Sequence, residues 1–157
     1  MKPETMDTAV RISIVVDAPI DKAFSVFTDD IGSWWPPEHH LAPVTEMVFE
    51  PRVGGQIYDR LKDGGESRWS TILAYEPPTR VVFSWAVSPQ WQIESHPEKT
   101  SEIEVRFIAL EPNKTRIELE HRNLDRHGDG WQQMRDAVSS EGGWPLGLSR
   151  FGVRIAA

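Results

Sequence analysis

Residues 101–122 read SEIEVRFIALEPNKTRIELEHR, and the alternation of side chains in this stretch decides the fold. Apolar residues occupy every second position in both halves, and mostly charged residues fill the positions between them, which is the pattern of half-buried strands. Pro112 and Asn113 interrupt the alternation, as expected for a tight turn. The stretch therefore predicts two antiparallel strands that share one apolar face and one charged face.

Five further stretches predict strands, so we expect an antiparallel sheet of about six or seven strands. In the first of them, AVRISIVVD at residues 9–17, isoleucine and valine alternate with arginine and serine. The others, separated by turns that contain glycine or proline, are residues 44–51, 56–61, 68–77 and 79–87. Each one-sided strand exposes an apolar face, which another layer of the fold must cover.

Helical periodicity is found after the first strand and near the C-terminal end. Large apolar residues recur every three or four positions between residues 20 and 31, which predicts a short amphipathic helix that breaks near residues 30–32. Pro36 and Pro37 prevent any helix from continuing past Trp35. Near the C-terminal end the same period occurs on both sides of Gly142–Gly143, so we expect a helix that is interrupted there.

Together these elements predict an α+β fold in a single domain, residues 1–157, with a core of about residues 8–155. We expect a curved antiparallel sheet wrapped around a long C-terminal helix, with two short helices after the first strand. A sheet that curls around one helix does not always fill its concave side, and the unfilled volume can form a pocket.

Composition excludes several classes of function. The chain has 24 acidic and 17 basic residues and a formal charge of −7, which argues against binding to a nucleic-acid backbone. It has no cysteine, so disulfides and thiolate metal sites are excluded. No stretch approaches the roughly 18 apolar residues that span a bilayer, and no signal peptide is visible at the N-terminus. We therefore expect a cytoplasmic protein.

Several segments, taken in order, resemble the START-like superfamily, also called SRPBCC or helix-grip. They are the API-DKAF, FTD and WW elements of residues 18–35, FEPRVGG at 49–55, VVFSW at 81–85, and LEHRNLDRHGDG with GGW between 119 and 144. More narrowly, the chain resembles the branch of homologues of the activator of the ninety-kilodalton heat-shock protein ATPase. The resemblance covers about residues 8–155 and implies the helix-grip fold with a deep apolar cavity between the sheet and the C-terminal helix.

Seven tryptophans in so short a chain are a large supply of aromatic surface. Each of them alone is more often ordinary core, but together they favour a pocket with aromatic walls. The residues that we expect to contact a ligand are Trp35, Trp69, Phe83, Trp85, Phe107, His121, Trp131, Met134, Trp144 and Leu148.

His121 is the best polar candidate, because it lies in phase with Ile117 and Leu119 and should face the concave side of the sheet. One interpretation is a core histidine that is hydrogen-bonded to a neighbour. The others are contact with a ligand or proton transfer, in which Tyr58, Tyr75 or Ser84 would assist. No catalytic residue is assigned, and His121 is the weak candidate.

No metal site or cofactor is expected. The histidines lack the spacing of convergent ligands, and the sequence has neither a nucleophile elbow nor a phosphate-binding glycine loop. We expect His39 and His40 to be solvated loop residues. For the adjacent Trp34 and Trp35, we expect one ring to pack inward near the cavity and the other to cover the helical segment or the entrance.

Three functions follow from the resemblance, and the first is our preferred hypothesis. It is binding of a small apolar or aromatic molecule in the cavity, without an assigned catalytic activity. The second is a cyclase- or aromatase-like enzyme that acts on a hydrophobic substrate in the same cavity. The third is a co-chaperone. It is less favoured, because the activators that gave the branch its name pair this domain with a separate chaperone-docking domain, and we expect only the single domain here. A homodimer is left open, since the fold does not decide function or assembly.

Overall fold

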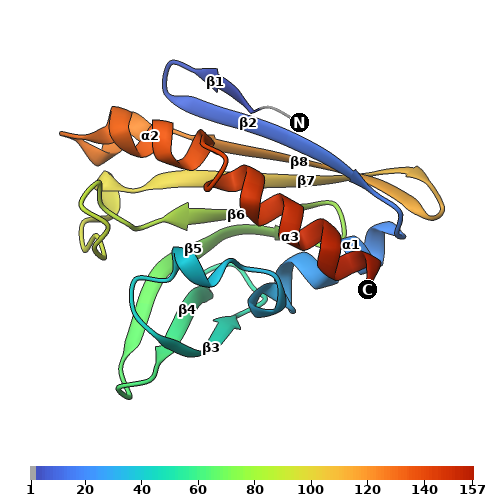
Figure 1. Ribbon diagram of the computed structural model, residues 1–157, viewed down its shortest axis with the longest axis horizontal. Helices are drawn as coiled ribbons and strands as arrows, with labels where there is room; N and C mark the ends of the chain where they lie inside the picture. Colours follow the sequence, from blue (N-terminus) through green and yellow to red (C-terminus); the bar gives the residue numbers. More distant parts are fainter. Residues whose placement is uncertain (1–2) are drawn as a thin grey trace.

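In the computed structural model, which describes residues 3–157, eight strands form one antiparallel sheet in the order β1-β2-β8-β7-β6-β5-β4-β3 (Figure 1). The strands are β1 (Glu4–Met6), β2 (Ala9–Val16), β3 (Val44–Phe49), β4 (Gln56–Leu61), β5 (Glu66–Glu76), β6 (Arg80–Trp85), β7 (Ser101–Glu111) and β8 (Lys114–Arg122). The α+β class and the curved sheet are confirmed, but the expected number of six or seven strands is wrong. The additional strand is β1, which pairs with β2 and is too short, at three residues, to show an alternating pattern.

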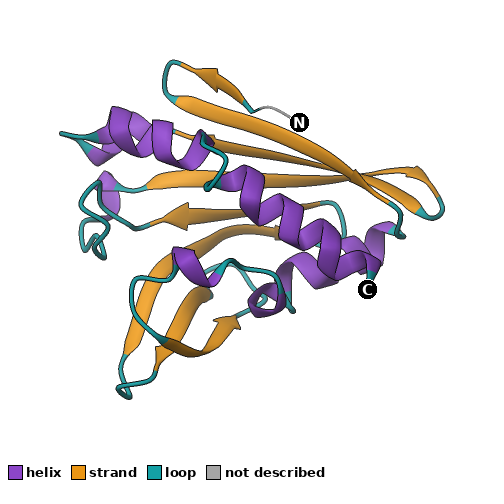
Figure 2. Ribbon diagram, in the orientation of Figure 1, coloured by secondary structure: helices purple, strands orange, loops and turns teal. Residues whose placement is uncertain are grey.

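Seven helical segments accompany the sheet in the described part of the chain. They are α1 (Ile20–Thr28), α2 (Trp131–Ser139), α3 (Trp144–Ala156) and the 3-10 turns η1 (Ile31–Ser33), η2 (Pro37–His39), η3 (Pro97–Lys99) and η4 (Leu124–His127). The long helix α3 crosses the concave face of the sheet, with α1 beside its C-terminal end (Figure 2). Among these described helices, none combines the length and the hydropathy that a membrane crossing requires.

The hairpin of β7 and β8 has the two faces that its sequence predicts. In β8, Ile117, Leu119 and His121 are fully or almost fully buried, whereas Arg116 and Glu118, at alternate positions, are exposed. A period of two residues places successive side chains on opposite faces of a strand. The buried face lies under the helices, and the charged face forms the outside of the sheet.

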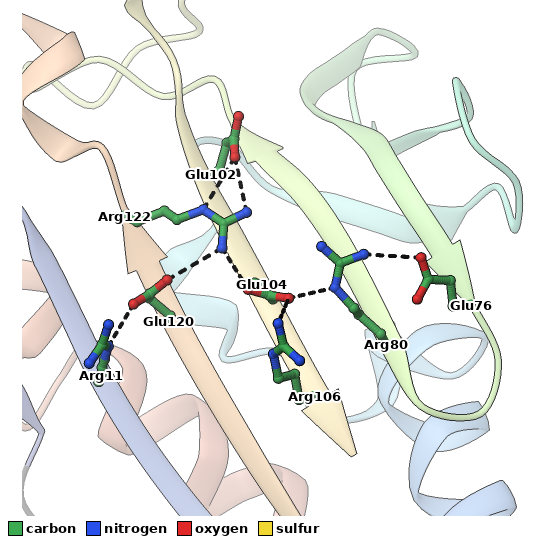
Figure 3. A network of polar contacts seen from close by, with 8 residues as sticks. All are labelled: Arg11, Glu76, Arg80, Glu102, Glu104, Arg106, Glu120 and Arg122. Atoms are coloured by element: carbon green, nitrogen blue, oxygen red, sulfur yellow. Dashed lines mark hydrogen bonds and ion pairs between the residues drawn. The ribbon is translucent and has the colours of Figure 1, made fainter. Parts of the chain in front are cut away.

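A network of ion pairs crosses the outer face at Glu104 (Figure 3). This carboxylate accepts hydrogen bonds from Arg80 at 2.5 Å and from Arg122 at 2.6 Å, and Arg106 lies 2.9 Å away. Burial raises the pKa of the Glu104 carboxyl, but the guanidinium groups outweigh burial and hold the pKa below its ordinary value. The network continues through Arg11, Glu76, Glu102 and Glu120.

Aromatic side chains fill the space between the sheet and the C-terminal half of α3. Phe27 of α1 contacts Phe107 of β7 and Phe151 of α3, with ring centroids 5.6 and 5.5 Å apart. Trp34 packs against Phe27 and Phe151, and its indole N–H donates to the Val26 carbonyl at 3.1 Å. This part of the concave side is therefore solid core.

The break between α2 and α3 lies at the double glycine, as the sequence predicts. A Cβ atom at Gly143 would lie 2.3 Å from the carbonyl oxygen of Val138, so no side chain fits there. The Gly143 N–H donates to the Ser140 carbonyl at 2.9 Å, which closes the turn between the helices. Pro145 then occupies the first turn of α3, where a missing N–H costs nothing. The break sets Trp144 at the start of α3.

Candidate functional site

A pocket of about 460 Å³ opens at the end of the sheet where α3 begins. Three segments line it: the stretch 35–41 that contains η2, the end of β6 with the loop up to residue 91, and the α2–α3 junction at residues 137–144. These segments gather at one end of the sheet (Figure 1). The volume lies within the usual range for small-molecule sites, about 300–1,000 Å³.

Four of the seven tryptophans line this pocket: Trp35, Trp85, Trp91 and Trp144. The ring centroid of Trp144 lies 5.8 Å from that of Trp35 and 6.2 Å from that of Trp85. Behind them Trp69 contacts both Trp35, at 5.1 Å, and Trp85, at 5.7 Å. The wall is therefore a packed set of indoles, which position one another through edge and tilted ring contacts.

Trp91 lies at the mouth of the pocket, with 46% of its surface exposed. Its φ of 60° is in the left-handed region, which bulky residues rarely adopt. The Trp91 N–H donates to the Ser88 carbonyl, and the Ser88 N–H donates to the Gln92 carbonyl, at 2.8 and 2.7 Å. These hydrogen bonds hold the loop in the conformation that places the indole at the mouth.

Trp85 carries a buried polar atom without a partner. Its indole N–H has no hydrogen-bond acceptor among the described residues, although the side chain lines the pocket. An indole N–H can only donate, and a buried donor without an acceptor costs roughly 1–3 kcal/mol. The indole part of the pocket wall is therefore apolar, with one unsatisfied donor buried within it.

A buried hydrogen-bond chain starts from the pocket at Trp144. The Trp144 indole N–H donates to Nδ1 of His121 at 3.1 Å, and His121 Nε2 lies 2.7 Å from the hydroxyl oxygen of Ser101. The same hydroxyl lies 2.7 Å from Nε2 of His127. Because His121 Nδ1 accepts, Nε2 carries the hydrogen and donates to Ser101. Ser101 then donates to His127, whose hydrogen lies on Nδ1.

Burial sets the charge state of this chain. It lowers the pKa of His121 to about 3, with a smaller contribution from the nearby His127. Burial also lowers the pKa of His127, opposed by the charge of Glu94. Both rings are therefore neutral near pH 7. The buried Nδ1 of His127 has no partner among the described residues, so the chain ends on an unsatisfied donor.

Polar contacts tie the segment 35–41 to the rest of the pocket. The two carboxylate oxygens of Glu38 accept from Arg150 of α3 at 2.8 Å each, and these hydrogen bonds lower the pKa of Glu38 to about 2. His39 Nε2 donates to the Gly142 carbonyl, and His40 Nδ1 lies 3.1 Å from Oδ2 of Asp59. The expectation that His39 and His40 are solvated holds only in part, because both are half-buried, each has a polar partner, and both line the pocket.

The structure distributes the ten expected ligand-contacting residues over three environments. Trp35, Trp85 and Trp144 line the pocket. Directly behind the wall, Phe83 contacts Trp69, and His121 contacts Trp85 and Trp144. The others lie elsewhere: Phe107, Met134 and Leu148 are buried in the core, and Trp131 is half-buried beneath the guanidinium of Arg135.

Sequence reasoning did not identify Trp91, His40 and Asp59. For Asp59 the sequence does contain a signal, since the residue lies two positions after the apolar Ile57 on β4. In the structure Ile57 faces inward and Asp59 is only 3% exposed. A charged residue in phase with a buried apolar residue is the same signal that identified His121. Nothing in the pattern around Trp91 or His40 distinguishes them from other loop residues. Within residues 3–157, no three His, Asp or Glu side chains are grouped to hold a metal ion.

The comparisons with known proteins agree with the fold described above. Residues 17–153 match the protein family described as Activator of Hsp90 ATPase homolog 1-like protein. The anthrahydroquino-gamma-pyrone synthase Txn09, solved in complex with SUM, is 38% identical, with 93% of this chain and 96% of that chain covered and a TM-score of 0.67. The search of curated proteins found no match.

Two further solved structures are similar. CalC from Micromonospora echinospora, described as a self-sacrificing resistance protein, is 28% identical, with 95% of this chain and 94% of that chain covered and a TM-score of 0.70. A protein from Arthrobacter aurescens is 18% identical, with coverage of 99% and 91% and a TM-score of 0.69. The last of these similarities concerns the fold alone.

Proposed function

This chain belongs to the family of Activator of Hsp90 ATPase homolog 1-like proteins, and from that membership we propose that it binds a small aromatic molecule in the indole-lined pocket. The single observation that carries the proposal is the wall formed by Trp35, Trp85 and Trp144. Indole faces favour flat, apolar ligands, because they gain aromatic contacts together with apolar burial.

The polar side chains among the lining residues, such as Glu38, His40 and Ser140, favour a ligand that carries a polar group on an otherwise apolar ring system. The similarity to Txn09, whose name describes an anthrahydroquino-pyrone product, supports the same class of molecule. We therefore infer an aromatic ligand that carries at least one carbonyl or hydroxyl group.

Binding of 1,8-dihydroxyanthraquinone tests this proposal. We expect saturable quenching of tryptophan fluorescence, and a stoichiometry of one ligand per chain by calorimetry. Trp91→Ala removes an exposed ring at the mouth and should weaken binding about tenfold, the equivalent of about 1.4 kcal/mol. Leu73→Ala is the matched control, because Leu73 is also exposed but lies on β5 outside the pocket. Equal affinity of both variants and the wild type would contradict the proposal.

A second candidate function is ring closure on such a molecule. The observation that favours it is the 38% identity with Txn09, which is named a synthase. Ring closure within one molecule needs a positioned proton acceptor and donor more than it needs a cofactor. Incubation of the protein with linear aromatic polyketones, followed by analysis of the mixture for cyclised products, tests this function. Products identical to those of a buffer control would contradict it.

A further inference from the structure

His40 and Asp59 form a histidine–carboxylate pair at the wall of the pocket. His40 follows η2, and its Nδ1 lies 3.1 Å from Oδ2 of Asp59 on β4. An ionised carboxylate only accepts hydrogen bonds, so His40 Nδ1 carries the hydrogen. In neutral His40 the opposite nitrogen, Nε2, then has a free lone pair.

The free nitrogen of His40 is accessible. His40 lines the indole-walled pocket, and its side chain is 16% exposed. Nε2 has no hydrogen-bond partner in the described part of the chain, and it is not among the buried atoms that lack one. His39 differs, because its Nε2 donates to the Gly142 carbonyl and its free lone pair lies on Nδ1, on a ring with no carboxylate partner among the described residues. Of these two neighbouring histidines, His40 is therefore the one whose ring is paired with a carboxylate.

Asp59 is placed to stabilise a positive charge on His40. Its side chain is only 4% exposed, and its second oxygen, Oδ1, has no partner among residues 3–157. A charge pair that is shielded from water interacts more strongly than one in water. When His40 takes up a proton, the imidazolium forms beside a carboxylate that is already in position, so little reorganisation is needed.

We propose that His40 is a catalytic acid–base residue of this pocket and that Asp59 is its positioning residue. The proposal rests on the proposed ligand site and names its chemistry. His40 Nε2 takes a proton from an acidic C–H or phenolic O–H of an aromatic carbonyl compound, and the freed electron pair moves into the ligand as an enolate or phenolate. After bonds rearrange within the ligand, the proton returns from Nε2. Protons and electrons balance without a further reactant.

The elimination of 5-nitrobenzisoxazole tests the base directly. A base removes the proton on C3. The electron pair of that C–H bond forms the nitrile, and the N–O bond breaks to release a coloured cyanonitrophenolate. The probe is flat and aromatic, so it suits an indole-lined pocket. We expect saturable elimination by the wild type and a loss of about 100-fold or more in kcat for His40→Gln, as is typical of removing a general base.

Asp59→Asn separates positioning from a structural role. The amide has the shape of the carboxylate but no charge, and it can donate to Nδ1 and so favour the other tautomer of His40. We expect kcat to fall about tenfold or more with KM unchanged. In nitrogen-15 spectra of the ring, the hydrogen should lie on Nδ1 in the wild type and shift toward Nε2 in Asp59→Asn.

His96→Gln is the matched control. His96 Nδ1 also lies 3.0 Å from a carboxylate, that of Glu94, but this histidine is exposed and does not line the pocket. Its removal should leave the elimination rate unchanged. Equal losses in His96→Gln and His40→Gln would overturn the proposal, and so would a wild-type ring with its hydrogen on Nε2.

Binding of 1,8-dihydroxyanthraquinone distinguishes failure of the acid–base proposal from failure of the proposed binding function. If the wild type and His40→Gln bind this probe equally but neither accelerates elimination, the acid–base proposal is overturned and the ligand site stands. If no variant binds the probe and none eliminates, the proposed function is contradicted, and the acid–base proposal fails with it.

Discussion

The indole N–H of Trp144 donates to Nδ1 of His121, joining a pocket-lining residue of α3 to the inward face of β8. This one contact determines the direction of the hydrogen-bond chain that ends at His127, because it forces the His121 hydrogen onto Nε2. It also connects the start of α3 to the sheet. The indole wall is therefore held in part by a histidine that does not itself line the pocket.

Trp144→Phe removes this N–H and keeps an aromatic ring. We expect the free energy of unfolding to fall by about 1–3 kcal/mol, because His121 Nδ1 becomes a buried acceptor without a donor. Urea denaturation measures the loss. Trp131→Phe is the control, since this half-buried ring has no indole hydrogen bond among the described residues, and its effect should be clearly smaller. Equal losses in the two variants would show that the contact contributes nothing specific.

The stability of the protein should fall as the pH is lowered below 6.5. Burial lowers the pKa of His121 from 6.5 to about 3 and also lowers that of His127. Between those two pH values the unfolded chain binds protons that the folded chain does not, so the unfolding free energy rises with pH. For His121 the slope approaches about 1.4 kcal/mol per pH unit, and His127 adds to it in the same direction.

Denaturation between about pH 5 and 7, above the range in which carboxylates titrate, measures this slope. His121→Gln removes one titrating group and should flatten the pH dependence. Trp131→Phe removes no titrating group and serves as a control, which should leave the slope as it is in the wild type. A wild-type protein whose stability is constant over this range would contradict the prediction.

The fold could be predicted because its strands are one-sided. In β2, β7 and β8 the period-2 pattern corresponds to the observed buried and exposed faces almost residue by residue. The exceptions come from features without a periodic signal. β5 carries a bulge between Ile72 and Ala74, which leaves Leu73 exposed although the sequence places it in phase with Trp69. Such irregularities depend on pairing with a neighbouring strand.

The candidate site could be predicted only in part, because its residues come together from segments far apart in sequence. Periodicity placed Trp85 and His121 on the inward face, and the double glycine placed Trp144 at a helix start. The sequence pattern gave no reason to pair His40, in a loop, with Asp59, on a strand 19 positions later. Nor could it show that Trp34 and Phe151 fill the concave side beneath α3.

Gly143→Ala should destabilise the junction that lines the pocket. The added Cβ would overlap the Val138 carbonyl oxygen at 2.3 Å, so the α2–α3 turn must shift. We expect a loss of about 1–3 kcal/mol in unfolding free energy, as for other forced overpacking. Gly142→Ala is the matched control, because a Cβ there meets no atom within 4 Å. Thermal unfolding of the two variants should separate them by several degrees. Identical midpoints would contradict the steric argument.

Glu104→Gln should destabilise the sheet from its outer face. The side chain of Glu104 is 8% exposed and has three guanidinium partners, so the neutral amide leaves Arg80 and Arg122 without their central counter-charge. We expect a loss of about 1–3 kcal/mol at pH 7. Glu66→Gln is the control, because both side chains of the Glu66–Arg68 pair are exposed and such pairs contribute about 0–1 kcal/mol.

The pH dependence provides an independent check on Glu104. Its pKa is lowered in the folded state, so its contribution is present above the unfolded carboxyl value of about 4.3 and is lost as the pH falls toward the folded value. The difference in unfolding free energy between wild type and Glu104→Gln should therefore be large at pH 7 and shrink below about pH 4. A difference that stays constant from pH 7 to pH 3 would mean that the amide acts through packing alone, because only a charged carboxylate gives a contribution that protonation removes.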